Sequence, residues 1–193
     1  MFFNKNLKNF RISNKIQKIN FLRKLGADFV VIKKFDKNFS KIKSISFIKN
    51  ILNTKLNAKF IFVSNNFRFG NKREGNVKQL IKYEEICNYK IIKPQPLLTK
   101  KKVISSTLIR NFLQNGKLNK ANKLLKRNWS IVGKVQKGRQ FGKKFGFPTA
   151  NIDIKDYVIA KPGVYAVKVK IQKNNKSIKG IANLGYRPTF KQN

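Results

Sequence analysis

Apolar and polar residues follow helical and strand periodicities along the first two thirds of the chain. Residues 13–25 carry apolar side chains at helical spacing, with Ser13 expected as the N-cap and Gly26 as the C′ residue. The pattern predicts further helices at 44–56, 77–89 and 106–113, and strands at 28–33, 59–64 and 90–93. Alternating strands and helices are typical of an α/β domain with a parallel sheet, whose ligands gather at the carboxyl ends of the strands.

The pattern changes after Trp129. Short strands are expected at 132–137, 163–171 and 177–184. Asn174 and Asn175 suit the turn of a hairpin. Such closely spaced strands predict a small antiparallel barrel. Residues 116–127 are expected to form a short helix that connects this part to the preceding α/β part.

The composition narrows the class of protein. With 41% hydrophobic residues among 193, the chain can bury a core, and its apolar runs are too short to cross a membrane. Its single cysteine, Cys87, excludes an internal disulfide and fits a reducing cytoplasm; we expect a buried structural thiol. The absence of histidine excludes histidine-based acid–base catalysis and histidine metal ligands within this chain.

The net charge is +38, from 45 basic and 7 acidic residues. This excess leaves two interpretations open. Lysine is spread from end to end among abundant Asn, Ile and Phe, as expected from drift toward A/T-rich codons. The other interpretation is a polyanionic partner such as RNA, and non-specific polyanion binding is expected physically in either case.

A glycine-rich loop contains the most specific candidate chemistry. Gly138, Gly142 and Gly146 stand at four-residue intervals before the sequence Phe147-Pro148-Thr149-Ala150-Asn151, with Lys143 between them. Glycines allow backbone N–H groups to approach a phosphate, and the oxygens of Thr149 and Asn151 are ligands of the kind that Mg²⁺ accepts. Three spaced glycines alone are equally compatible with an ordinary turn between strands.

Two earlier motifs also have a structural alternative. In Asn66-Phe67-Arg68-Phe69-Gly70, followed by Lys72-Arg73-Glu74-Gly75, the phenylalanines suit either a flavin ring or the core. In Ile104-Ser105-Ser106-Thr107-Leu108-Ile109-Arg110, a helix start offers hydroxyls and N–H groups to an anion. A plain Ser105 or Ser106 N-cap with a surface Arg110 is the alternative.

Together these segments resemble, in order, the bacterial bifunctional riboflavin kinase/FMN adenylyltransferase family. The sequences Gly163-Val164-Tyr165-Ala166-Val167 and Ala182 to Phe190 are similar to the next kinase segments. The resemblance implies a Rossmann-like nucleotidyltransferase domain, a parallel sheet with helices, at 1–115. A helical connector at 116–127 and a partial antiparallel β-barrel of riboflavin kinase type at 128–193 would follow.

The resemblance also implies substrates and site residues. The family uses ATP and Mg²⁺ to phosphorylate riboflavin to FMN and to adenylylate FMN to FAD. Its pattern assigns adenylyltransferase phosphate binding to Ser105, Ser106, Thr107 and Arg110, and flavin binding to Asn66, Phe67, Arg68 and Phe69. It assigns kinase ATP binding to Gly142, Lys143, Gly146, Phe147, Thr149 and Asn151, with Thr149 and Asn151 at Mg²⁺.

Some family features are missing from this sequence. The family's His-x-Gly-His motif and the Glu that serves as the kinase base have no counterpart here, so both modules are expected to be truncated and the catalytic residues stay unassigned. Ser64 stands where a glycine is usual, and Asn66 where an acid is more common. We expect little activity from the chain alone. The alternatives are a flavin- or nucleotide-binding remnant that needs a complementary chain, and a basic RNA-binding protein.

Overall fold

A computed structural model describes residues 10–136, 146, 149–154, 156–171 and 174–185. The described residues divide between two compact units. Residues 31–103 belong to the first unit, and residues 10–30 together with those from 104 onward belong to the second. The predicted Gly142, Lys143 and Phe147 lie outside the described residues.

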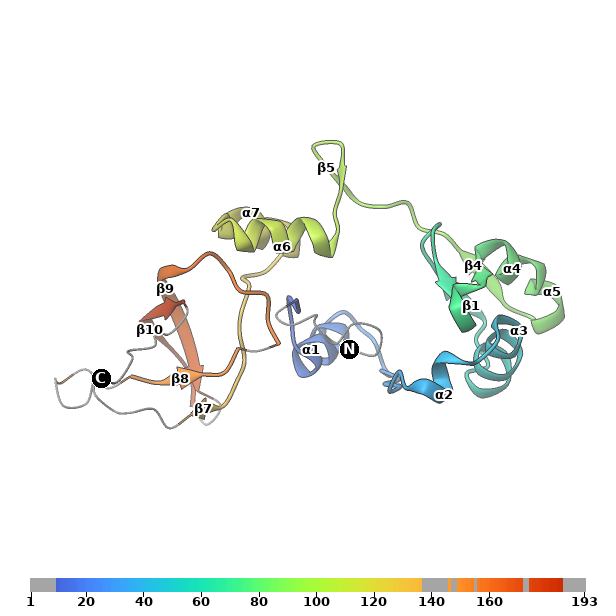
Figure 1. The fold of residues 1–193 in the computed structure, drawn as a ribbon, viewed down its shortest axis with the longest axis horizontal. Helices are drawn as coiled ribbons and strands as arrows, with labels where there is room; N and C mark the ends of the chain where they lie inside the picture. The colour runs from blue at the N-terminus through green and yellow to red at the C-terminus, as the bar shows by residue number, and fades with distance from the viewer. Residues whose placement is uncertain (1–9, 137–145, 147–148, 155, 172–173, 186–193) are drawn as a thin grey trace, which may run out of the picture. The chain divides into compact units, whose positions relative to one another are not determined.

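The first unit is organised around a parallel pair of strands, β1 (Phe60–Phe62) and β4 (Lys90–Ile92) (Figure 1). Ile61 pairs with Ile91, and both side chains contribute to the core on one side of the pair. The parallel pairing predicted by the alternating pattern is therefore confirmed for these two strands.

Four helical segments accompany this pair: α3 (Ser44–Ser46), the π-helix η1 (Phe47–Lys55), α4 (Val77–Lys82) and α5 (Glu84–Cys87). The first two run on from one another, so the helix predicted at 44–56 is present, with its middle wound as a π-helix. Apolar side chains close the core: Ile48, Phe69, Val77, Leu80, Cys87, Tyr89 and Ile91 are buried. Burial of Cys87 confirms that it is a structural thiol.

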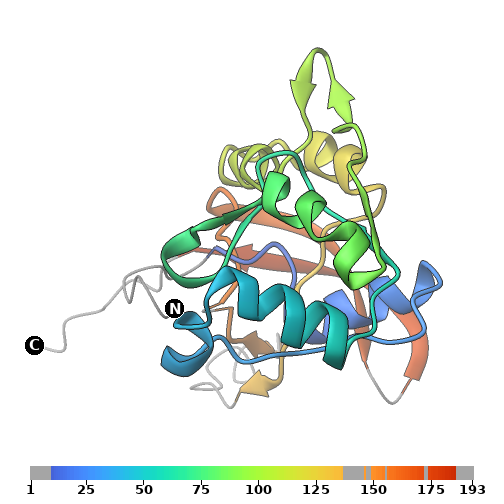
Figure 2. The ribbon, with the colours of Figure 1, turned by 90° about the vertical axis from the view of Figure 1, so that its right-hand side faces the viewer.

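Short elements complete the first unit. They are α2 (Lys37–Ser40), the antiparallel pair β2 (Arg68–Phe69) and β3 (Gly75–Asn76), the 3₁₀ turn η2 (Asn71–Arg73), and the hairpin of β5 (Leu98–Thr99) and β6 (Lys102–Val103), visible in Figure 2. The strand predicted at 28–33 was wrong: Phe29 is 90% exposed and Val31 75% exposed, and no strand pairs with this run among the described residues. An apolar run without a partner strand gains no ladder hydrogen bonds.

The second unit contains the helices α1 (Lys15–Lys24), α6 (Ser106–Gln114) and α7 (Leu118–Leu125). The N-cap of α1 is Asn14, not the predicted Ser13, because Asn14 and Gln17 form a reciprocal capping box. Gly26 has a φ of +89°, as a C′ residue should. Helices α6 and α7 pack together on a second core of Ile109, Leu113, Ala121, Val158 and Ala160.

The strands of the second unit pair in two antiparallel sheets. β7 (Val135–Gln136) pairs with β8 (Asn151–Ile152), and β9 (Gly163–Ile171) pairs with β10 (Asn174–Leu184). Asn174 pairs with Ile171, so the prediction of a turn at Asn174 and Asn175 was wrong: both residues belong to β10. None of the helices among the described residues combines the length and apolarity needed to cross a membrane.

Candidate functional site

The Asn66–Gly75 loop of the first unit packs closely on the start of α3. Gly70 has a φ of +76°, and a Cβ built there would lie 2.7 Å from the backbone nitrogen of Ser44. A Cβ on Gly75 would lie 2.8 Å from both the Phe69 ring and the Cβ of Ser44. Both glycines are therefore required by close backbone approach, and Gly70 also by its left-handed conformation.

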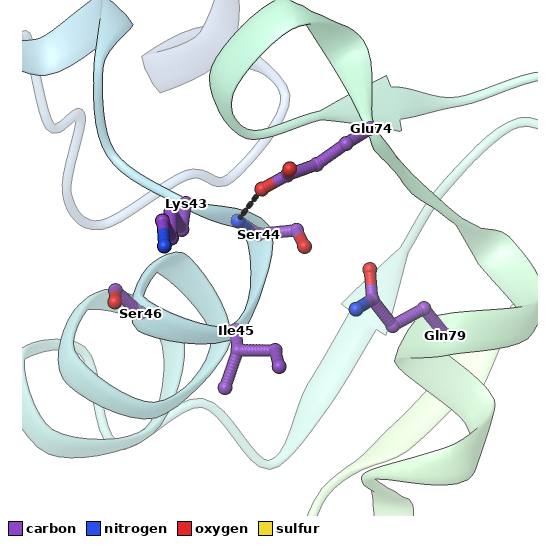
Figure 3. A pocket seen from close by; sticks show the side chains of 6 residues that line it. All are labelled: Lys43, Ser44, Ile45, Ser46, Glu74 and Gln79. Atoms are coloured by element: carbon purple, nitrogen blue, oxygen red, sulfur yellow. Dashed lines mark hydrogen bonds between the residues drawn. The ribbon is translucent and has the colours of Figure 1, made fainter.

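Glu74 fixes the same helix start. The backbone N–H of Ser44, a residue only 4% exposed, donates to Glu74 Oε1 at 2.7 Å (Figure 3). The N–H of Asn71 donates to the carbonyl of Ile42 at 2.7 Å, which links the loop to the segment just before the helix. A carboxylate at a helix start satisfies an amide that has no partner within the helix and interacts favourably with the helix dipole.

An open depression of about 340 Å³ lies at this junction. Its lining residues, all drawn in Figure 3, are Lys43, Ser44, Ile45, Ser46, Glu74 and Gln79. The sequence motif pointed to the loop but not to the α3 residues opposite it. The available signal was Glu74 itself, because a glutamate in a chain with only 7 acidic residues is expected to have a specific partner.

The predicted flavin-binding residues divide between core and surface. Phe67 and Phe69 stack with ring centroids 5.6 Å apart and an interplanar angle of 17°. Phe69 is 7% exposed and packs in the core beside Phe47, whereas Phe67 is half-buried. Asn66 and Arg68 are exposed, and the Ser64 hydroxyl donates to Asn66 Oδ1 at 2.9 Å. The core interpretation therefore holds for Phe69.

The predicted phosphate-binding residues of the second unit begin α6. Ser105 is its N-cap, and its Oγ accepts the N–H of Leu108 at 3.2 Å, which confirms the predicted cap. Ser106 and Thr107 in the first turn are exposed. Arg110, one turn further, is half-buried and donates from Nε to the carbonyl of Phe10 at 2.7 Å. This bond orients the guanidinium.

Of the predicted kinase residues, Asn151 is the first residue of β8 and Thr149 lies two residues before it. Thr149 and Asn151 are both exposed, so their oxygens are accessible. Gly146 is exposed, with a φ of +78°, and a Cβ placed there would meet no atom within 4 Å. Asp153 Oδ2, two residues beyond Asn151, accepts a long 3.4 Å hydrogen bond from Gln136 Nε2. Among the described residues, His, Cys, Asp and Glu form no group of three that could hold a metal.

A polar network anchors α1 within the second unit. Arg127 donates to the Ser13 hydroxyl at 2.8 Å and lies over the Phe21 ring at 4.0 Å from its centroid. Burial lowers the pKa of Arg127. The indole N–H of Trp129 donates to the carbonyl of Ile12 at 2.9 Å, and its ring packs against the second core. Trp129 is thus a structural anchor of the second unit.

Several acids of the described residues serve as acceptors for backbone N–H groups. Asp36 accepts from Phe39 at 2.8 Å, Glu84 accepts from Ile91 at 2.6 Å, and Glu74 accepts from Ser44 as described. The hydrogen bond from the Phe39 backbone lowers the pKa of Asp36. These acids therefore hold local structure.

Comparison with known proteins identifies the family. Residues 1–108 match the family model for FAD synthetase, and residues 125–193 match the model for riboflavin kinase. The first match covers more than half of the chain, and the chain therefore belongs to the FAD synthetase family, with a riboflavin kinase domain following.

Similar proteins carry both activities in their names. The chain is 42% identical over 181 residues to the bifunctional riboflavin kinase/FMN adenylyltransferase of Buchnera aphidicola subsp. Schizaphis graminum, covering 93% of this chain and 58% of that protein. It is 35% identical over 179 residues to the Escherichia coli K12 protein of the same name, covering 93% and 57%. The chain thus spans less than two thirds of these relatives.

A solved structure has the same fold over most of the chain. It is the crystal structure of a macrolide-efflux protein from Streptococcus pneumoniae, with a TM-score of 0.75 and 28% sequence identity. The match covers 93% of this chain and 57% of that one.

Proposed function

We propose that this chain acts in FAD biosynthesis, in the phosphorylation of riboflavin to FMN by ATP and the adenylylation of FMN to FAD. The observation that carries the proposal is the succession of an FAD synthetase match and a riboflavin kinase match along one chain. The names of the bifunctional relatives support it.

For adenylyl transfer, we assign phosphate binding to the start of α6. The exposed hydroxyls of Ser106 and Thr107 and the N–H groups of the first turn suit an anion. Because Nε of Arg110 is bonded to Phe10, a phosphate would use the terminal guanidinium nitrogens. Holding the phosphates and balancing their charge supplies most of the catalysis in reactions of this kind.

For the kinase step, we assign ATP and Mg²⁺ binding to Thr149 and Asn151. A hydroxyl and an amide carbonyl are hard oxygen donors, and Mg²⁺ commonly takes few protein ligands beside substrate phosphates and water. The exposed side chains of both residues fit such a shared coordination shell. When bound, the ion would neutralise phosphate charge, while this chain's residues position the nucleotide.

For the flavin, we assign contacts to Asn66, Phe67 and Arg68. Phe69 supports Phe67 from the core through their stacked rings. A half-buried aromatic ring held in this way presents a rigid apolar surface suited to an aromatic ligand.

We further propose that β1 and β4 belong to a Rossmann-like sheet and that β7 to β10 belong to a kinase-type barrel. The parallel pairing of the first two strands and the antiparallel pairing of the other four support this assignment. The domain boundaries at 115 and 128 are part of this proposal.

Calorimetric titration with Mg-ATP tests the two nucleotide assignments separately. We expect Thr149→Ala to abolish one binding event and Arg110→Ala another, because we assign the two residues to different nucleotide sites. Arg23→Ala, which removes an exposed arginine of α1 that is not among the assigned residues, is the control. A folded chain that binds no Mg-ATP, or variants that bind as the parent does, would contradict the assignments.

A further inference from the structure

Helix α7 carries a row of lysines on its surface. This row, called here the α7 lysine stripe, consists of Lys117, Lys120, Lys123 and Lys126. All four side chains are exposed, and they stand at three-residue intervals. Lys117 and Lys126 are the N-cap and C-cap residues, so the stripe accompanies the whole helix, which lies beside α6 in Figure 1.

The charge of the stripe has no acidic counterpart in the sequence around it. Residues 86–152 contain neither Asp nor Glu. Like charges three residues apart on a helix repel one another, and no carboxylate nearby in the sequence relieves that repulsion. A bound polyanion would relieve it.

The apolar side of α7 is committed to the protein core. Ala121 is fully buried, and Leu118, Leu124 and Leu125 pack against the cluster that contains Ile109 and Leu113 of α6. This packing holds the stripe on a fixed support. It also argues against a membrane surface as the partner, because a helix that lies in a membrane interface needs its apolar face exposed to lipid.

We propose that the α7 lysine stripe binds the phosphate backbone of a nucleic acid without reading its bases. Three residues of helix rise by about 4.5 Å and turn by about 300°, so each stripe lysine stands about 60° further round α7 than the one before, along a curved path that a flexible single strand can follow. Lysine acts as a point charge toward phosphate, whereas base recognition uses arginine forks or aromatic platforms. The stripe contains neither, so binding should follow charge alone. None of the four lysines is among the residues assigned to flavin and nucleotide.

The test compares two fourfold variants of the full 193-residue chain. In the stripe variant, all four stripe lysines become Gln, a residue that keeps good helix propensity. The control variant has the same loss of charge at exposed lysines on four other elements: Lys18→Gln, Lys78→Gln, Lys90→Gln and Lys168→Gln. Binding to a labelled RNA of about 20 nucleotides is measured by fluorescence anisotropy between about 0.05 and 0.3 M salt.

The slope of log K against log salt, compared between the two variants, decides whether the stripe lysines contact phosphates. Loss of four phosphate contacts should flatten the slope of log K against log salt by about 2.8 for a single strand, and the control should flatten it by less than half as much. A Lys→Arg version of the stripe should retain the parental slope. Should circular dichroism show that the fourfold variant is unfolded, Lys120→Gln with Lys123→Gln should flatten the slope by about 1.4.

Several results would overturn the proposal. Equal flattening in the stripe and control variants would mean that the charge acts diffusely over the chain. A more than about tenfold preference for RNA over DNA of the same sequence, or for one RNA sequence over its scrambled form, would show readout beyond the backbone. Stripe-dependent binding to anionic lipid vesicles but not to RNA would identify a membrane as the partner.

Discussion

Replacing Glu74 should release the start of α3 from the glycine loop. The Ser44 N–H is buried, and the Glu74 carboxylate accepts its hydrogen bond at 2.7 Å. In Glu74→Ala this amide loses its acceptor, and an unsatisfied buried donor costs about 1 to 3 kcal/mol. Because the Glu74 side chain itself is exposed and water can partly replace it, we expect about 1 to 2 kcal/mol. Glu74→Gln keeps an oxygen acceptor without the charge and should lose less.

Amide hydrogen exchange at Ser44 measures this loss locally. A cost of one or two kcal/mol corresponds to exchange about 5- to 30-fold faster in Glu74→Ala. Glu85→Ala is the matched control, since it removes an equally exposed acid from the same unit and should change stability by less than about 0.5 kcal/mol. The reasoning is refuted if Ser44 exchanges equally fast in the two alanine variants.

Three further predictions concern packing and charge. Gly70→Ala places a Cβ within 2.7 Å of Ser44 N at a positive φ, so we expect it to destabilise the first unit in urea unfolding by more than about 2 kcal/mol. Gly26→Ala, with open space around its Cβ, should cost about 1 kcal/mol. Equal costs in the two variants would contradict the packing argument. Burial raises the pKa of Tyr89 to about 12, and its hydroxyl donates to the Leu80 carbonyl at 2.7 Å. The folded state therefore favours the neutral phenol. The parent should be about 1 kcal/mol more stable than Tyr89→Phe, and this difference should shrink as pH rises from about 10 to 12. A difference in stability that stays constant over this pH range would contradict the raised pKa of Tyr89. Because a net charge of +38 repels itself, the thermal midpoint should rise between about 0.05 and 0.5 M salt, and a midpoint unaffected by salt would refute this.

The sequence predicted those helices and strands that depend on residues close to one another along the chain. The helix that begins after Ser105 could be predicted because the cap and the apolar spacing lie within a few residues of one another. Strands β1 and β4 could be predicted from short apolar runs between helices. The capping box of Asn14 and Gln17 was also readable, since a polar cap followed three residues later by Gln is its signature, and it places the cap at Asn14 instead of Ser13.

The remaining features depend on residues distant in sequence. Ser13 is buried against Arg127, 114 positions away, so its hydroxyl has a partner that no local pattern shows. Glu74 meets Ser44 across 30 positions, which left the α3 side of the depression out of the predicted site. Residues 28–33 have the composition of a strand, yet pairing requires a neighbour that composition cannot supply.

Flavin binding tests the central claim most directly. FMN is titrated with the chain in the presence of Mg-ATP, and quenching of flavin fluorescence is followed. We predict saturable quenching, weakened about 3- to 10-fold by Phe67→Leu, which alters the half-buried ring of the loop. Phe29→Leu, at a phenylalanine that is 90% exposed elsewhere, should bind as the parent does. A chain that circular dichroism shows to be folded but that leaves FMN fluorescence unchanged would contradict the assignment of this chain to FAD biosynthesis.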